Sequence, residues 1–519
     1  MKLTIYQDGS PTVLEYSTPT YLSTLFASGH IPFAMPCGGR GSCHKCKVRV
    51  QGQISPITKE EASYLTDEEI AQGIRYACMT TVYGDAEVTL PDTSAARIVS
   101  AGQLPVFALA PWADGYGAAF DIGTTTVAAY LYRLVDGKQL ASASQKNPQV
   151  TFGGDVISRI THALHGGSAT LAEAVRGCIN ELLHSLCQAG GISMQELHAL
   201  VLSGNTAMEY LLMGANPASI AQAPFRQDRY FGEFISASSL GLEPRAAKVY
   251  VARCISAYVG GDITSGILST GMLSAEKPEL LIDIGTNGEI ALAVSGKILC
   301  CSTAAGPAFE GAGIFMGMTA SDGAIAHVHA ANGTLTFEAI GESLPVGICG
   351  SGIIDAVAAF LTLGYIDETG AIDSSSLPEE LLAEADGVSA IRIPGSDVCI
   401  TQKDIRAVQL AKSAICSGVE TLLEIAKLRA QDIGQLLIAG GFGSVLYVSS
   451  AEAIGLIPSG FSGRIKSVGN AAGMGAIMQL LSRDMIHRAE QLARTAETVE
   501  LSTHPVFREA YIENMLFPL

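Results

Sequence analysis

Two features are missing from this sequence of 519 residues: a long apolar run and an excess of positive charge. No uninterrupted apolar stretch reaches the roughly 18 residues of a membrane-spanning helix, although the mean hydropathy is +0.31. Acidic residues outnumber basic ones by 50 to 32, which argues against a nucleic-acid partner held through phosphates. Residues 1–6 alternate as a strand does and lack the apolar segment of a signal peptide. We therefore expect a cytoplasmic protein that binds neither membranes nor nucleic acids.

The size and composition indicate a folded chain of several domains. At about 150 residues per domain, the length corresponds to about three domains. Apolar residues make up 48% of the chain and charged residues 16%, which excludes a disordered protein. Strands and helices alternate from about residue 117 to about residue 484. The expected fold class is therefore α/β, preceded by a smaller α+β domain.

Four of the twelve cysteines have the spacing of an iron–sulfur site. Cys37, Cys43 and Cys46 are separated by five and then two residues, and Cys78 lies well downstream. A 2Fe–2S cluster needs four thiolates, and the glycines between the first two cysteines would let the loop wrap closely around it. A structural zinc site is the alternative, but such sites usually pair two Cys-x-x-Cys knuckles, whereas Cys78 stands alone.

One short motif occurs twice, each time after an apolar strand. Residues 120–127 read Phe-Asp-Ile-Gly-Thr-Thr-Thr-Val, and residues 281–289 read Leu-Ile-Asp-Ile-Gly-Thr-Asn-Gly-Glu. We interpret each copy as a β-hairpin whose turn directs N–H groups and hydroxyls toward phosphate oxygens. Asp121 and Asp283 would hold Mg²⁺ or its water molecules beside them. The residues expected to take the phosphates are Gly123, Thr124, Thr125 and Thr126 in the first copy, and Gly285, Thr286, Asn287 and Gly288 in the second.

Further glycine-rich turns occur along the chain, mostly after apolar strands, where open α/β sheets bind ligands. No Walker-type or dinucleotide-binding fingerprint competes with them. With the two hairpins, these turns resemble the ordered set of the actin, sugar-kinase and Hsp70 ATPase superfamily. The resemblance implies a duplicated ATPase fold in which the hairpins clamp the phosphates of ATP. It also implies that a turn formed by Gly440, Gly441, Phe442 and Gly443 packs against adenosine.

These observations divide the chain into four segments. Residues 1–92 resemble a plant-type ferredoxin domain with a β-grasp sheet. Residues 93–117 are expected to form a short linker, residues 118–484 the ATPase domain with its two half-domains, and residues 485–519 a C-terminal helix and tail.

A ferredoxin domain joined to this ATPase fold resembles the reductive activators of corrinoid proteins, which serve methyltransferases and O-demethylases of anaerobes. The resemblance implies an ATP-dependent enzyme that returns Co(II) of a corrinoid protein to Co(I). It implies a low-potential electron donor and a 2Fe–2S cluster that passes the electron to the corrinoid. It does not decide whether the protein forms a homodimer. Members of the family often have a longer linker and a small middle domain, whereas only about 25 residues separate the two domains here.

The residue that would activate the hydrolytic water is not decided by the sequence. Asp262, Glu289 and Glu310 are the candidates, and each also fits an ordinary carboxylate at a helix start or a turn.

Three other functions fit part of the sequence. A radical-dehydratase-type activator also joins an ATPase to an iron–sulfur cluster, but it shares that cluster across a dimer and lacks a ferredoxin domain. A non-enzymatic redox sensor would keep the nucleotide as a structural ligand. A small-molecule kinase would have no use for a fused electron carrier.

Overall fold

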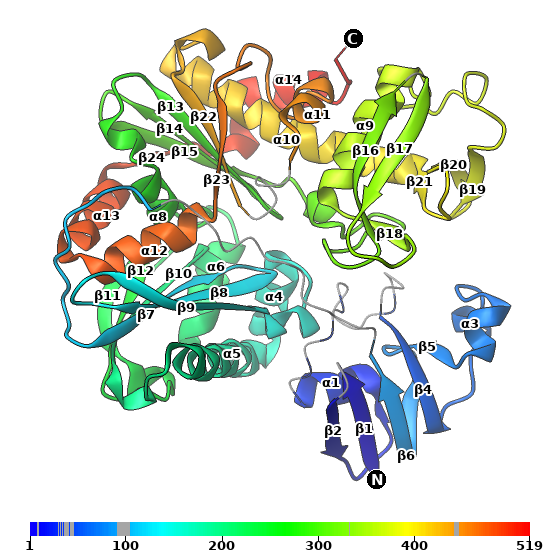
Figure 1. Cartoon of the computed structure of the whole chain (residues 1–519), viewed down its shortest axis with the longest axis horizontal. Coiled ribbons are helices and arrows are strands. Elements are labelled where there is room, and N and C mark those ends of the chain that lie inside the picture. The colour runs from blue at the N-terminus through cyan, green and yellow to red at the C-terminus, as the bar shows by residue number, and fades with distance from the viewer. Residues whose placement is uncertain are drawn as a thin grey trace.

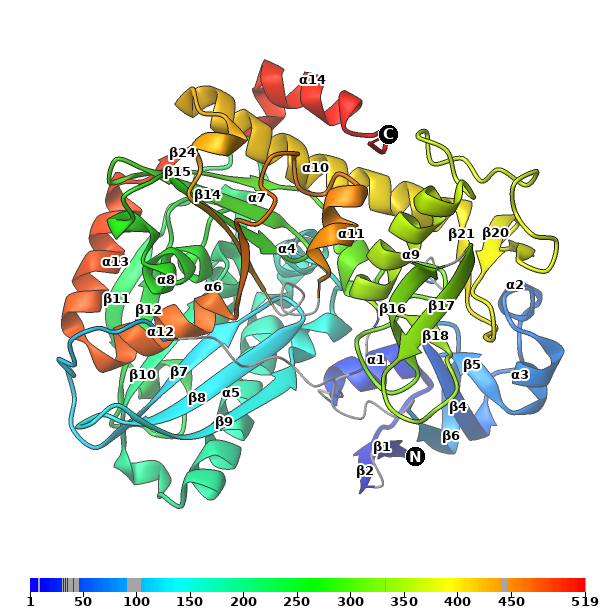
Figure 2. The same cartoon turned by 45° about the horizontal axis from the view of Figure 1, so that its top comes forward.

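The chain folds into an N-terminal domain, two repeated halves and a lobe inserted in the second half. In Figure 1, a view of the computed structural model, the N-terminal domain is blue, the first half runs from cyan to green, and the lobe is yellow-green. Figure 2 shows the same arrangement from a second direction. The structure describes residues 1–7, 10–29, 31, 33, 35, 41, 46–90, 104–331, 333–440 and 446–518.

The N-terminal domain is a mixed sheet covered by short helices, as the sequence predicts for a β-grasp fold. The strand order is β2-β1-β6-β4-β5, with β3 beside β6, and β1 runs parallel to β6. Leu3, Ile5, Val48 and Val88 alternate along their strands and point into one apolar core. The elements are β1 (Lys2–Gln7), β2 (Ser10–Glu15), β3 (Thr20–Tyr21), α1 (Leu22–Ser28), β4 (Lys47–Ile54), α2 (Lys59–Ala62), α3 (Asp67–Ala71), β5 (Ile74–Tyr76) and β6 (Thr81–Thr89).

The first half is built on a sheet with the order β11-β12-β10-β7-β8-β9. Strands β7, β8 and β9 form an antiparallel meander, whereas β10 is parallel to β7 and β12 is parallel to β10. The strands are β7 (Tyr116–Ile122), β8 (Thr126–Arg133), β9 (Lys138–Lys146), β10 (Leu197–Gly204), β11 (Phe231–Ser236) and β12 (Lys248–Arg253). The helices are η1 (Pro148–Thr151), α4 (Val156–His162), η2 (Ala163–Gly167), α5 (Ser168–Gly190), η3 (Met194–Glu196), α6 (Thr206–Met213), α7 (Ala218–Ala221), η4 (Ala237–Leu240) and α8 (Gly261–Thr270).

The second half repeats this topology in a sheet with the order β23-β22-β13-β14-β15-β24. Strands β13, β14 and β15 form the meander, and β22 and β23 are the added parallel strands. This repetition confirms the expected duplicated fold. The strands are β13 (Glu279–Ile284), β14 (Gly288–Val294), β15 (Lys297–Thr303), β22 (Gln435–Ala439), β23 (Ile465–Gly469) and β24 (Glu497–Thr498). The helices are η5 (Met272–Ser274), η6 (Pro307–Glu310), α10 (Gln402–Ala426), η7 (Ala430–Asp432), α11 (Val448–Ala453), α12 (Ala471–Leu481), α13 (Arg483–Thr495), η8 (Leu501–Thr503) and α14 (Pro505–Glu513).

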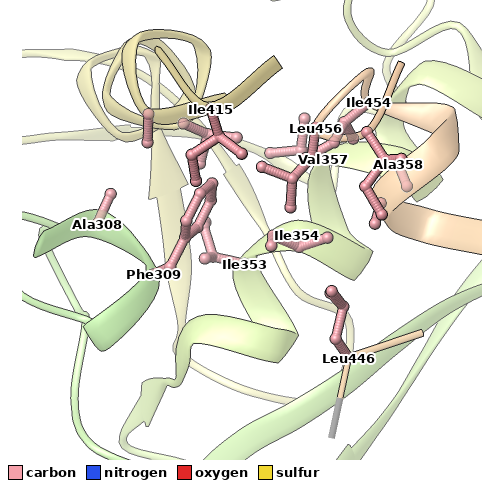
Figure 3. Packing of buried hydrophobic residues seen from close by; sticks show 14 of the residues in the cluster. Ala308, Phe309, Ile353, Ile354, Val357, Ala358, Ile415, Leu446, Ile454 and Leu456 are labelled. Atoms are coloured by element: carbon pink, nitrogen blue, oxygen red, sulfur yellow. The ribbon is translucent and has the colours of Figure 1, made fainter. Parts of the chain in front are cut away.

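The lobe between η6 and α10 is an insertion that the sequence analysis did not separate from the second half. It contains β16 (Ala324–Ala331), β17 (Thr334–Ala339), β18 (Gly347–Ile348), α9 (Gly350–Leu363), β19 (Leu382–Ala385), β20 (Val388–Arg392) and β21 (Cys399–Thr401). Figure 3 shows Ile354 and Val357 of α9 packed with residues of α10, of η6 and of the segment that follows α11 in one apolar core. The lobe and the second half therefore share a continuous core.

The two halves exchange helices. Ile263 and Ile267 of α8, which follows the first sheet, pack with Leu281 of the second sheet. Ile477 and Leu480 of α12, which follows the second sheet, pack in turn on β7, β8 and β10. The two helices also contact each other, and Leu104, Phe107 and Trp112 of the expected linker pack against this region. Each half thus completes the core of the other.

The C-terminal segment docks on α10, a point that the sequence left open. Gln409, Lys412 and Ser413 of α10 donate hydrogen bonds to backbone carbonyls of Met515, Leu516 and Tyr511, respectively. Within the described part of the chain, no helix combines the length and apolar character needed to cross a membrane.

Substitution Gly475→Ala tests the contact between the exchanged helices. A Cβ atom at Gly475 would lie 1.9 Å from the Ser265 carbonyl oxygen, so the helices would have to move apart. We expect the free energy of unfolding to fall by about 1–3 kcal/mol in denaturant titrations. The control is Gly177→Ala in α5, where a Cβ has no neighbour within 4 Å among the residues that the structure describes. Helix propensity predicts a gain of up to about 1 kcal/mol there. Equal effects of the two variants would contradict the interpretation.

Candidate nucleotide and cluster sites

Two of the four cysteines expected to bind the cluster lie side by side, although 32 positions separate them in the sequence. The Sγ atoms of Cys46 and Cys78 are 3.2 Å apart. The antiparallel pairing of β4 with β5 brings them together, since Lys47 lies opposite Tyr76 and the Ala77 N–H donates to the Cys46 carbonyl. Cys37 and Cys43 lie outside the described residues. Thiols that converge at the end of a sheet fit the ligand set of a 2Fe–2S cluster.

A buried ion pair holds the strand that leads to Cys78. Both Arg75 and Glu61 are nearly inaccessible to solvent, and Arg75 donates two hydrogen bonds of 2.9 and 2.7 Å to the two Glu61 carboxylate oxygens. Glu61 also accepts the Tyr76 N–H. Bidentate geometry of this kind fixes both position and orientation. Glu61 on α2 therefore fixes the position of β5 up to Tyr76, two residues before Cys78.

Substitution Glu61→Gln should destabilise the N-terminal domain, because it leaves the buried Arg75 charge without a counterion. We expect a loss of about 3 kcal/mol in the free energy of unfolding, followed through the 2Fe–2S absorption in denaturant. Glu15→Gln, which breaks the exposed pair with Lys2, is the control and should cost less than about 1 kcal/mol. A loss of similar size in both variants would refute the anchoring role.

Both repeated motifs form hairpins, but their turns differ in length. In the first, Ile122 lies opposite Val127, and in the second Ile284 lies opposite Gly288. A backbone hydrogen bond closes each turn, from the Gly123 N–H to the Thr126 carbonyl and from the Gly285 N–H to the Asn287 carbonyl. The first turn is therefore one residue longer than the second.

Glu310 joins the two hairpins. Its Oε2 accepts a hydrogen bond of 2.8 Å from Thr125, and its Oε1 accepts one of 3.0 Å from Thr286. The two copies of the motif thus lie side by side at one candidate nucleotide cleft, as two halves that share one nucleotide require. Since both carboxylate oxygens already bind hydroxyls, the geometry favours a bridging role for Glu310 over that of a free base.

Three aspartates converge on this cleft from different elements. Burial raises the pKa of Asp121 to about 6, although the side-chain amide of Asn470 donates to it at 2.8 Å. Burial and then the Asp121 charge raise the pKa of Asp283 to about 7. Burial and then the Asp283 charge raise the pKa of Asp262, at the start of α8, to about 8.

Glu289 lies beside this group and not at its centre. It is directly opposite Asp283 in the ladder of β13 and β14, and it accepts a hydrogen bond of 3.3 Å from Ser302. Burial, followed by the charges of Asp262 and Asp283, raises the pKa of Glu289 well above its ordinary value.

The repulsion between these acidic side chains fits a site for a divalent cation, because a positive charge would favour their ionised forms. Mg²⁺ commonly keeps several water molecules and binds one or two carboxylates together with substrate phosphates. Among the described residues, no three cysteine, histidine or acidic side chains are placed to bind one ion directly. The arrangement therefore suits Mg²⁺ that is held partly through water and a nucleotide.

Two asparagines of the cleft were missed as site residues. Asn205 donates to the Thr124 hydroxyl at 3.1 Å, and Asn470 donates to Asp121. Each also caps a helix, because its Oδ1 accepts a backbone N–H of α6 or α12. Both follow a glycine at the end of a strand and precede a helix, so a Gly-Asn pair at such a junction is the sequence signal that points to them.

The turn expected to contact adenosine is described only at its first residue. Gly440 has φ +93°, and a Cβ at this position would lie 2.9 Å from Oδ1 of Asp283. Gly441, Phe442 and Gly443 lie outside the described residues. Gly440 therefore brings the start of this turn against the second hairpin.

Binding of Mg–nucleotide at pH 7 should release protons. Asp262 and Asp283 are largely or partly protonated at that pH, and a nearby cation favours their ionised forms, so their pKa values fall on binding. Affinity should therefore rise between pH 6 and pH 9, and proton release should vanish near pH 9. Calorimetry in two buffers of different ionisation enthalpy measures the release. Asp262→Asn should reduce it, and buffer-independent heats at pH 7 would contradict the assignment.

Sequence models of three families match successive parts of the chain. They are described as the 2Fe-2S iron-sulfur cluster binding domain (residues 5–83), the RACo middle region (residues 116–275) and the C-terminal domain of RACo, the ASKHA domain (residues 277–519). The middle-region match covers β7 to α8, so these residues form the first repeated half. A middle region is thus present within the segment that the sequence analysis assigned to the ATPase.

Individual relatives extend over most of the chain. The corrinoid activation enzyme RamQ of Eubacterium limosum is 32% identical and covers 97% of each chain. A Co(II) methylated amine-specific corrinoid protein reductase of Methanosarcina barkeri is 24% identical over 76% of each chain. The solved structure of a reductive activator for corrinoid,iron-sulfur protein has a TM-score of 0.71 at 30% identity, and covers 99% of this chain and 98% of its own.

Proposed function

Since the chain belongs to the RACo-type family of reductive activators of corrinoid proteins, we propose that it catalyses the ATP-dependent reduction of Co(II) to Co(I) in a corrinoid protein. The observation that supports the proposal is the bridge of Glu310 between the two hairpins, because two halves that share one nucleotide need both hairpins side by side. The same chain carries the converging thiols of Cys46 and Cys78 in a separate domain. An electron carrier and a nucleotide clamp are thus covalently joined.

Energetics explain why both parts are needed. The 2Fe–2S cluster supplies single electrons at about −400 mV, which is too high a potential for favourable reduction to Co(I). The two halves can supply the missing free energy if ATP favours one arrangement of them, and hence one arrangement of the activator and its partner. Glu310 and the exchanged helices are the contacts through which the halves would respond.

We assign roles to the predicted residues as part of this proposal. Asp262 is the favoured base among the three candidates, because it lies beside Asp283 at the start of α8 and its raised pKa is close to neutral pH. Asp121 and Asp283 orient Mg²⁺ or its waters. The cluster ligands are Cys37, Cys43, Cys46 and Cys78; the phosphate-binding residues are Gly123 to Thr126 and Gly285 to Gly288; the adenosine-binding turn is Gly440 to Gly443.

The finer identity of the partners is also proposed. The corrinoid protein would belong to a methyltransferase or O-demethylase system, and a low-potential donor would reduce the cluster in the cytoplasm. The names of two relatives mention corrinoid activation and a methylated amine-specific corrinoid protein. Light scattering of the purified protein would decide whether two copies form a homodimer.

The direct test mixes the protein with a Co(II) corrinoid protein and a reductant, with and without Mg–ATP. We expect the absorption of Co(I) to appear with ATP and to be much weaker without it, because reduction is unfavourable unless nucleotide shifts the balance. Equal formation of Co(I) under both conditions would reject the proposed coupling.

A pair of variants makes this test specific. Asp262→Asn should lower ATP turnover by a factor of about 10² to 10⁴ and should slow Co(I) formation, whereas nucleotide binding persists. The control is Asp136→Asn, which removes an exposed carboxylate of the first half and should leave both rates unchanged.

A further inference from the structure

Asn147 connects the first hairpin to the segment that follows β9. Its side chain is fully buried, and its Nδ2 donates to the Gly123 carbonyl at 2.8 Å. Its backbone N–H donates to the Thr125 carbonyl, also at 2.8 Å. Asn147 therefore binds two carbonyls of the turn that is expected to hold phosphate, and it must follow any shift of that turn.

Thr151 connects the other end of this segment to the N-terminal domain. Its buried hydroxyl lies 3.1 Å from the Ile31 carbonyl and 3.4 Å from the Phe33 carbonyl. Both residues belong to the apolar core of the N-terminal domain, where the Phe33 ring packs edge-on against Phe26. In the sequence they directly precede the stretch that contains Cys37. The hydrogen bonds of Thr151 therefore hold residues that come just before the stretch expected to bind the cluster.

The residues between these two contacts form a short, stiff connection. Asn147 caps η1 by accepting the Gln149 N–H at 3.0 Å, and Pro148 begins the turn with a restricted φ. All four residues of η1 are buried. The Gln149 side chain donates to the Leu171 carbonyl and accepts from Arg159. Because residues 147–151 are tightly packed, a displacement at Asn147 is expected to shift Thr151 as well.

We propose that Asn147 and Thr151 are positioning residues that couple nucleotide at the first hairpin to the position of the segment before Cys37. Phosphate binding moves the carbonyls of Gly123 and Thr125, Asn147 carries that movement into η1, and Thr151 passes it to the Ile31 and Phe33 carbonyls. This inference rests on the proposed function for its purpose, but it makes a separate structural claim. It identifies how an ATP-dependent change reaches the electron carrier through a path of five residues, 147–151.

The test compares Thr151→Val with Thr151→Ser in the full-length protein with its cluster. Valine keeps the shape but lacks the hydroxyl, whereas serine keeps the donor. Hydrogen exchange of peptides covering residues 22–35 is measured with and without Mg²⁺ and the β,γ-imido analogue of ATP. We expect a nucleotide-dependent change in the wild type and in Thr151→Ser, and its loss in Thr151→Val. In the Co(I) assay, the acceleration by ATP should fall about tenfold in Thr151→Val.

Several outcomes would overturn the inference. A nucleotide response of wild-type size in Thr151→Val would do so, and so would a lost response in Thr151→Ser. Thr151→Ala serves if valine prevents folding, since it removes the hydroxyl without a branched side chain, and a retained response in it is equally decisive. If the wild type forms Co(I) equally with and without ATP, the proposed function fails, whereas the exchange measurement still decides the role of Thr151.

Discussion

The packing of α8 against α12 is the contact on which the nucleotide cleft depends. Each helix covers the sheet of the opposite half, so separating the halves would expose apolar side chains worth about 1.5–3 kcal/mol each. On the hairpin side, Glu310 joins the halves through hydrogen bonds to Thr125 and Thr286, which contribute about 1.5–3 kcal/mol each. In the proposed function, the stronger apolar contact serves as a fixed hinge, and nucleotide acts at the weaker polar bridge.

Charge gives the cleft its preference for a cation. Asp121, Asp262 and Asp283 come from three elements. Burial raises the pKa of all three carboxyl groups, and repulsion from neighbouring aspartates raises those of Asp262 and Asp283 further. Without a ligand, burial of these carboxyl groups and the repulsion between them cost free energy. A bound Mg²⁺ would lower that cost, because an opposite charge favours the ionised carboxylates. Perturbed carboxyls that cluster in a cleft are typical of functional sites.

Local features of the fold and site could be predicted from sequence, whereas long-range partners could not. The Asp-Ile-Gly-Thr repeats identified both hairpins, because turn geometry depends on a few adjacent residues. The cysteine spacing placed Cys46 and Cys78 at one site for a similar reason. Asn470 lies 349 positions from the Asp121 that it binds, and only the packing of α12 on the first sheet brings them together. The exchange of helices could not be predicted either, because the apolar patterns of α8 and α12 do not indicate which sheet each helix covers.

The anchoring of Trp112 has a consequence for how the partner must approach. Its indole N–H donates to the Gln479 carbonyl of α12, and Ala110 bonds with Leu481 and Arg483, so the chain is secured to the body before β7 begins. From Leu90, the last described residue after β6, to Leu104, the backbone can span at most about 50 Å. That length limits how far Leu90 can lie from Leu104, and the N-terminal domain with its cysteines extends from Leu90. A cobalt centre that accepts the electron must therefore come within the combined reach of this tether and of the N-terminal domain.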